Sequence, residues 1–170
     1  RDVEGRYDRI ASIEMFEAVG EKYWPAYFGK LRDCLQPGGR AALQIITIAD
    51  QCFERYRTGV DFIQRYIFPG SGICSIGSIM ESVAKESDLS LIHLEDFGTH
   101  YARTLREWSL RLTASHSKLV ELGYSEELYR MWQFYFAYCE GGFLERSIGV
   151  AQLWFAKPAS THTDPATGRF

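Results

Sequence analysis

Residues 7–20, YDRIASIEMFEAVG, and residues 41–49, AALQIITIA, decide the fold. Tyr7–Ile13 predicts a short buried strand, because four of its seven residues are apolar. Between the two stretches, apolar side chains recur at helical spacing from Trp24, and Pro25 fits only a first turn, so a helix is expected to begin near residues 22–24. Pro37-Gly38-Gly39 is expected to end it.

The run 41–49 is apolar on both faces, which predicts a central strand covered by helices on each side. Strand, helix and strand over so short a distance predict a βαβ unit with parallel strands. Further helices are expected over residues 51–67, 78–87 and 100–122, and a Tyr/Phe-rich one from an N-cap at Ser125 to about 145. Residues 89–94 and Ile148–Ala156 predict two more strands, and 158–170 a disordered tail.

The composition fits one globular domain of 170 residues: 46% hydrophobic, 15% aromatic and 24% charged. A net charge of -3 gives no electrostatic field for nucleic acid, so no nucleic-acid partner is expected. No apolar run approaches the roughly 18 residues that span a bilayer, and no signal peptide is seen. The four cysteines form no CxxC pair, which predicts reduced thiols in a cytoplasmic protein.

Four polar residues stand where chemistry is expected. Glu14 and Glu17 follow the first predicted strand, and ligands of open α/β sheets bind outside the carboxyl ends of strands. Gln44 places an amide inside an apolar strand, where it needs partners. Tyr101 lies at a predicted helix start. The alternatives are a helix-capping role for the acids and core positions for Gln44 and Tyr101. No histidines share metal-ligand spacing, so no metal site is expected.

These fragments together resemble one family. The motifs YDRIASIEMFEAVG, LQPGG, LQIITI, YIFPG and HYARTL, followed by a Tyr/Phe-rich helix, are similar in order and spacing to cyclopropane-fatty-acyl-phospholipid synthases and mycolic acid cyclopropane synthases. The resemblance covers residues 7–157. It implies an α/β fold: the C-terminal part of a Rossmann-like class I methyltransferase sheet, spanning residues 1–157, with inserted helices that form the acyl-lipid side.

The resemblance also implies an activity, in which S-adenosylmethionine donates a methylene or methyl group to the double bond of an unsaturated acyl phospholipid to form a cyclopropane. Bicarbonate held in the site would take the proton. The family's bicarbonate ligands fall on Glu17 and Tyr101 with a backbone contact at Ile46, and Gln44 stands where better-known members have His. Ile13 corresponds to a cofactor-lining position, and four apolar residues correspond to the acyl channel: Phe68, Leu105, Cys139 and Phe143.

The family's glycine-rich loop and following acidic residue lie upstream of these motifs, and no GxGxG occurs in the 170 residues. We therefore expect this part alone to be inactive. Two alternatives stay open: a non-catalytic module that binds acyl lipid or a membrane surface, and a lipid C-methyltransferase without ring closure. The resemblance further implies peripheral contact with the inner membrane face, and a dimer is one alternative for the oligomeric state.

Overall fold

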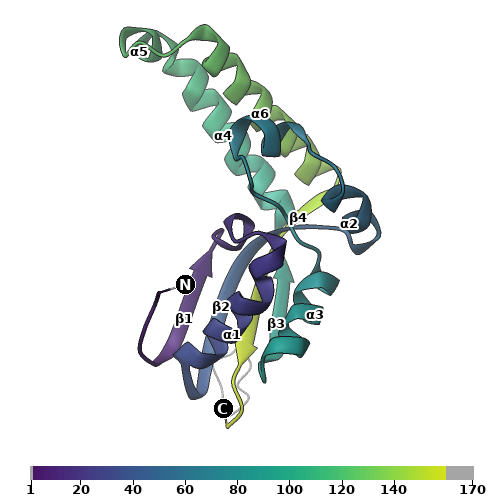
Figure 1. The fold of residues 1–170 in the computed structure, drawn as a ribbon. Coiled ribbons are helices and arrows are strands. Elements are labelled where there is room, and N and C mark those ends of the chain that lie inside the picture. Colours follow the sequence, from purple (N-terminus) through teal and green to yellow (C-terminus); the bar gives the residue numbers. More distant parts are fainter. Residues whose placement is uncertain (1, 160–170) are drawn as a thin grey trace.

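A four-stranded sheet organises the computed structural model, which describes residues 2–159 (Figure 1). The strands are β1 (Tyr7–Ile13), β2 (Leu35–Ile48), β3 (Ser90–Asp96) and β4 (Ile148–Ala156), in the order β1-β2-β4-β3. β1 and β2 are parallel, whereas β4 is antiparallel to both of its neighbours. The predicted βαβ unit is confirmed, with α1 (Trp24–Cys34) between its strands.

Helices α1 and α3 (Ile76–Glu86) pack side by side on one face of the sheet. Alternate residues of β2 point into this layer: Ala41, Leu43 and Ile45 are almost completely buried, as are Leu153 and Phe155 of β4. Ser75 caps α3 through a reciprocal capping box with Ser78. The main core therefore lies between two helices and two central strands.

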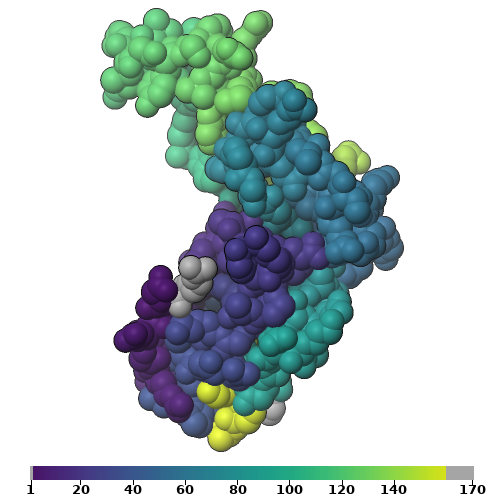
Figure 2. Space-filling model, in the orientation of Figure 1, coloured from purple at the N-terminus to yellow at the C-terminus, as the bar shows by residue number. Residues whose placement is uncertain are grey.

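A long helical hairpin extends from one end of the sheet (Figures 1 and 2). It consists of α4 (Gly98–Ala114) and α6 (Glu126–Leu144), joined at the tip by α5 (His116–Glu121). Ser125 caps α6 as expected, because its hydroxyl accepts a hydrogen bond from the Leu128 N–H. A smaller core at the base of the hairpin contains Ala102, Leu105, Phe136, Cys139, Phe143 and Val150. The short elements are η1 (Phe16–Ala18), η2 (Glu21–Tyr23), α2 (Asp50–Arg57) and η3 (Ile63–Ile67).

Three predicted boundaries are wrong. Pro37-Gly38-Gly39 does not end α1, which stops at Cys34; it lies within β2. The pairing jumps there from Tyr7–Leu35 to Arg9–Arg40, so residues 36–39 bulge out of register. The helix expected over 51–67 is two elements, since α2 ends at Arg57 before Gly59. The helix expected over 100–122 breaks at Ser115 into α4 and α5.

The predicted burial of two strands is also corrected. β1 is largely exposed, because it is an edge strand paired only with β2 in the described chain. β2 is fully buried on one face only; the face with Ala42 and Gln44 is half-buried. Among residues 2–159, α1 and α3 share the first face, and the opposite face meets helices only at the end where the hairpin begins.

Two smaller predictions concern the ends and the thiols. The tail expected over 158–170 lies outside the described residues from 160 onward; Pro158 accepts a hydrogen bond from the Gly38 N–H. All four cysteines are free thiols in the described chain, as expected for reduced residues.

Phe28 tests the main core. Its ring is completely buried and contacts Phe16, Tyr27 and Phe155. Phe28→Ala should lower the free energy of unfolding by about 3–5 kcal/mol, because it removes the ring and leaves a cavity. Ala26→Ser, at an exposed position of the same helix, should change it by less than about 0.5 kcal/mol. Urea denaturation measures both, and equal effects would contradict this account of the core.

Candidate active site

Two carboxylates follow β1 directly and are positioned by the aromatic residue between them. Phe16, in η1, is 1% exposed and stacks on Trp24 at 5.2 Å between ring centroids. Burial of this ring fixes the turn that carries Glu14 and Glu17 beyond the carboxyl end of the strand. Glu14 has a positive φ of 49°, a conformation that residues other than glycine rarely adopt. Its N–H donates to the Gln44 carbonyl at 2.9 Å, which holds the turn against β2.

The Glu14 carboxylate is bonded through both oxygens. Tyr101, in the first turns of α4, donates its hydroxyl to Glu14 Oε2 at 2.7 Å. Gln44 Nε2 donates to Glu14 Oε1 at 2.8 Å. Gln152 Nε2 in turn donates to Gln44 Oε1 at 3.1 Å, across the pairing of β2 with β4. A continuous chain of hydrogen bonds thus links the sheet to the hairpin through Glu14.

Glu17 has a different environment. Its Oε1 accepts a hydrogen bond from the Ile46 N–H at 2.6 Å, whereas Oε2 is buried and has no partner among the described residues. Burial raises the pKa of the Glu17 carboxyl, the Ile46 hydrogen bond partly opposes this, and the negative charge of Glu14 adds to it. Burial is the largest of these effects, so the Glu17 carboxyl is more readily protonated than a solvent-exposed glutamate.

Both acids face a cavity of about 830 Å³ between the end of the sheet, the η3 segment and the base of the hairpin. Its wall is mostly apolar and rich in aromatic rings, including Phe68, Trp108, Trp132, Tyr135, Phe136 and Phe143. Burial raises the pKa of the Tyr101 hydroxyl, and its bond to Glu14 raises it further, so this phenol remains a donor. Burial likewise raises the pKa of the Cys139 thiol to about 12.

The structure brings together most of the residues named from the sequence. Seven of them line the cavity: Glu17, Ile46, Phe68, Tyr101, Leu105, Cys139 and Phe143. Gln44 reaches it through Glu14. Ile13 lies outside the lining, 68% exposed, in register with Gln44 on the half-buried face of the sheet. Its assignment to a cofactor contact stays a prediction.

Gln152 is the residue that sequence reasoning missed. It is an amide within the apolar strand β4, which is the same signal that singled out Gln44 in β2. The two amides are directly opposite each other, but only the register of the antiparallel pair reveals it.

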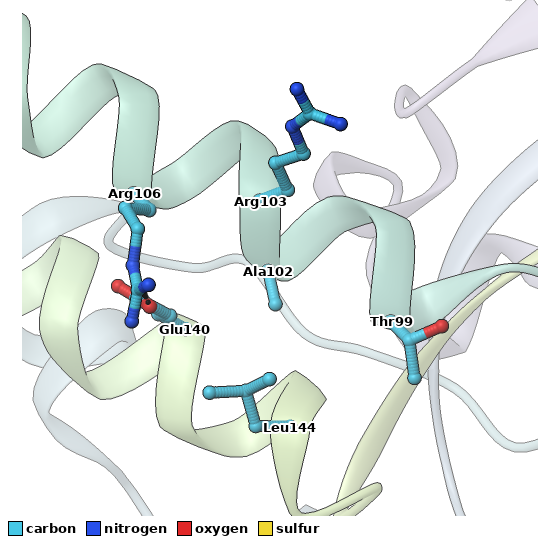
Figure 3. Close-up of a pocket in the computed structure, with 6 residues that line it drawn as sticks. All are labelled: Thr99, Ala102, Arg103, Arg106, Glu140 and Leu144. Atoms are coloured by element: carbon cyan, nitrogen blue, oxygen red, sulfur yellow. Dashed lines mark hydrogen bonds and ion pairs between the residues drawn. The ribbon is translucent and has the colours of Figure 1, made fainter.

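A second, shallower pocket of about 190 Å³ lies between α4 and α6 (Figure 3). Arg106 Nε contacts Glu140 Oε1 there at 2.8 Å, and Arg103 points away from this pair. The Arg106–Glu140 pair is satisfied within the hairpin, and the residues predicted from the sequence line the larger cavity instead, so the larger cavity is the candidate active site.

Comparison with known proteins points to one family. The family model described as mycolic acid cyclopropane synthetase matches residues 1–153. Tuberculostearic acid methyltransferase of Mycobacterium tuberculosis is 39% identical over 152 residues, which are 89% of this chain and 36% of that protein. Cyclopropane-fatty-acyl-phospholipid synthase of Escherichia coli is 32% identical over 158 residues, 92% of this chain and 39% of that protein.

Solved structures show the same likeness. The cyclopropane synthase MmaA2 from Mycobacterium tuberculosis superposes with a TM-score of 0.81 at 29% identity, covering 91% of this chain and 57% of that one. A mycolic acid cyclopropane synthase complexed with SAH and CTAB gives 0.82 at 28% identity, with coverage of 92% and 57%. The chain spans 36% and 39% of the length of the two curated relatives and 57% of each of these two solved structures. Within the described residues, no helix combines the length and apolarity needed to cross a membrane.

The paired amides generate a first prediction for the site. Gln44→Leu or Gln152→Leu alone leaves a half-buried amide without its partner, and each should cost about 1 kcal/mol of unfolding free energy. The double variant should cost less than the sum, by about 0.5–1.5 kcal/mol, because neither unpaired amide remains. Urea denaturation of the four proteins gives the coupling energy, and strict additivity would show that the amides do not interact.

The raised pKa of Glu17 generates a second prediction for the site. As the pH rises above 4.5, the unfolded chain releases this proton before the folded chain does, so folded stability falls until the raised pKa is passed. Glu17→Gln cannot ionise. Its stability relative to the original chain should therefore increase as the pH rises above 4.5 and level off once the raised pKa of Glu17 is passed. Denaturation across this range measures the difference; a gap that is constant with pH would mean that burial leaves the Glu17 pKa unshifted.

Proposed function

Because the chain belongs to the mycolic acid cyclopropane synthetase family, whose members are S-adenosylmethionine-dependent methyltransferases, we propose that it forms the acyl-lipid side of such an enzyme. The complete protein would transfer the methyl carbon of S-adenosylmethionine to the double bond of an unsaturated acyl chain in a phospholipid and close a cyclopropane ring. The observation that carries the proposal is the pair of acids, Glu14 and Glu17, at the wall of a large apolar cavity.

The cavity suits an acyl substrate on physical grounds. Its volume lies in the range of pockets that enclose small ligands, and most of its wall is apolar, although Arg55, Asp61 and two serines also line it. Attack of a double bond on an electrophilic methyl group leaves a carbocation on the acyl chain, which water would trap. A dry site is therefore required, and aromatic faces stabilise positive charge. Phe68, Leu105, Cys139 and Phe143 are the proposed channel residues.

The polar residues of the wall have proposed roles in the same reaction. S-adenosylmethionine, when bound, supplies a methyl group on positively charged sulfur, and Ile13 is the proposed contact with it. Glu17, Tyr101, Gln44 and the Ile46 backbone form the proposed catalytic group. Their hydrogen bonds keep two acids beside the cavity, where positive charge develops on the substrate.

A lipid substrate also implies a surface of the protein that contacts the membrane. Unsaturated acyl chains reside in bilayers, so the proposed enzyme would contact a membrane peripherally. Support comes from the hairpin, whose outer half exposes large apolar side chains: Leu110 is 60% exposed, Val120 56% and Leu122 65%.

A second candidate is transfer of the methyl group without ring closure. Two observations favour it: Gln44 stands where the better-known members have His, and a tuberculostearic acid methyltransferase is 39% identical to this chain. An amide can donate a hydrogen bond but cannot carry a proton onward. Loss of the proton gives either a cyclopropane ring or, without ring closure, a methylene-branched chain of the same mass. Only the structure of the product therefore separates these candidates.

The test uses the complete protein, S-adenosylmethionine and vesicles of dioleoyl phosphatidylglycerol. We expect the acyl chains to gain one methylene unit by mass spectrometry, with S-adenosylhomocysteine released in equal amount. Proton NMR of the released fatty acid then distinguishes cyclopropane protons from vinyl protons. Absence of any transfer, with S-adenosylmethionine bound, would contradict the proposed activity.

Phe68 links the cavity to the substrate. Its ring is 46% exposed and contacts Trp132 and Tyr135 edge-on. Phe68→Ala should raise KM for the lipid about 4- to 12-fold, since roughly half of the ~1.5–3 kcal/mol from burying such a ring against the acyl chain is lost. Tyr23→Ala removes a similarly exposed ring away from the cavity and should leave KM unchanged. Equal effects in a vesicle assay would count against this channel.

A further inference from the structure

Glu14 holds Tyr101, which the family resemblance assigns to bicarbonate, and Gln44, which stands where better-known members have His. Tyr101 has a single O–H, and it is given to Glu14 Oε2 at 2.7 Å. The Gln44 amide nitrogen lies 2.8 Å from Glu14 Oε1. The Ile46 N–H, the remaining donor of the group, is given to Glu17 Oε1 at 2.6 Å. Each of these three groups therefore donates a hydrogen bond to a carboxylate of this chain.

The residues present consequently do not fit a bound bicarbonate. An anion at this place would have to displace Glu14 from both of its partners. It would also lie beside two acidic side chains in a largely apolar cavity, where like charges repel strongly. A carboxylate and a bicarbonate ion offer similar oxygen pairs, so one excludes the other.

We propose that Glu14 itself is the base that removes the proton from the transferred methyl group, in place of a separate bicarbonate ion. This assignment rests on the proposed function, because it concerns the proton that the methyl-transfer reaction must lose. It adds a catalytic residue whose carboxylate lines the cavity and is held by fixed donors from the sheet and the hairpin.

The step balances without another reactant. The π electron pair of the substrate forms a bond to the methyl carbon, the carbon–sulfur bond breaks with its pair on sulfur, and the other olefinic carbon becomes a cation. A C–H bond of the former methyl group then breaks. Its electron pair closes the ring, and its proton moves to the Glu14 carboxylate, which becomes a neutral acid. Such a proton is strongly acidic, so a carboxylate that already accepts two hydrogen bonds is basic enough.

Gln152 and the strained backbone act as positioning elements. Gln152 donates to Gln44 Oε1, which leaves the Gln44 Nε2 group directed at Glu14. The positive φ of Glu14 turns its side chain from the end of β1 toward Tyr101. Three elements, β2, β4 and α4, thereby fix one carboxylate in a geometry suited to proton transfer.

Glu17 is the alternative base, and its setting favours a different role. One of its oxygens is held by the Ile46 N–H. The other is buried without a partner in the described chain, and this burial raises the pKa of the group. A single donor holds Glu17, whereas two donors from different elements orient the Glu14 carboxylate. Variants of both acids therefore enter the test.

The decisive experiment compares turnover of the complete enzyme in carbonate-free buffer and with added bicarbonate, using dioleoyl phosphatidylglycerol vesicles. We expect the unmodified enzyme to be equally fast in both. Glu14→Gln keeps the shape and an acceptor oxygen but is no base, so its rate should fall about 10²–10⁴-fold with the melting temperature nearly unchanged. Glu81→Gln, an exposed acid on α3, is the matched control and should keep full activity.

A binding measurement provides a readout that does not need turnover. Glu14→Gly suits the positive φ and empties the space between Tyr101 and Gln44. Bicarbonate should then raise the melting temperature of Glu14→Gly but not that of the unmodified protein.

Three results would overturn the assignment: bicarbonate-dependent turnover of the unmodified enzyme, full activity of Glu14→Gln with loss in Glu17→Gln, or bicarbonate-induced stabilisation of the unmodified protein. Absence of methyl transfer by the unmodified enzyme and by all variants would instead refute the proposed function. The melting measurements would still decide whether the Glu14 carboxylate or bicarbonate occupies the anion site.

Discussion

Burial of the Phe16 ring is the constraint on which the site depends. The ring lies among Trp24, Tyr27 and Phe28, so the turn after β1 cannot move without exposing it. Glu14 and Glu17 stand on either side of this anchor and are carried to opposite neighbours, one to Tyr101 and one to the Ile46 backbone. Hydrophobic burial thus supplies the free energy that keeps two like-charged groups close together.

Hydrogen bonds to separate donors offset the repulsion between the two acids. Each acid is bonded to a group on a different part of β2: Gln44 through its side chain and Ile46 through its N–H. Gln44 and Ile46 are two positions apart and lie on the same face of β2, but one bond uses a side-chain amide and the other a backbone N–H, so the two acids do not compete for one donor. The arrangement tolerates two carboxylates only because each has its own donor.

The sequence was sufficient for elements whose signal is local. Tyr7–Ile13 and Ile148–Ala156 match the expected strands, and Ser125 caps its helix. Prediction from the sequence failed where tertiary pairing overrides local preference. The Pro37-Gly38-Gly39 segment bulges within a strand instead of ending a helix, and the exposure of β1 depends on its place at the sheet edge. In the site, Glu14 was visible as an acid after a strand, but its bonds to Tyr101 and Gln44 join positions 87 and 30 residues away. No spacing rule encodes such contacts.

Cys139 illustrates what the apolar wall does beyond holding a lipid. Under the proposed function, the Cys139 sulfur would share the cavity with a sulfonium methyl donor and would be a rival nucleophile for the same carbon, and self-methylation would inactivate the protein. Only the thiolate reacts readily, and the pKa of about 12 keeps this thiol protonated at neutral pH. Under the proposed function, the desolvation that protects a carbocation from water therefore also protects the enzyme from its own alkylating reagent.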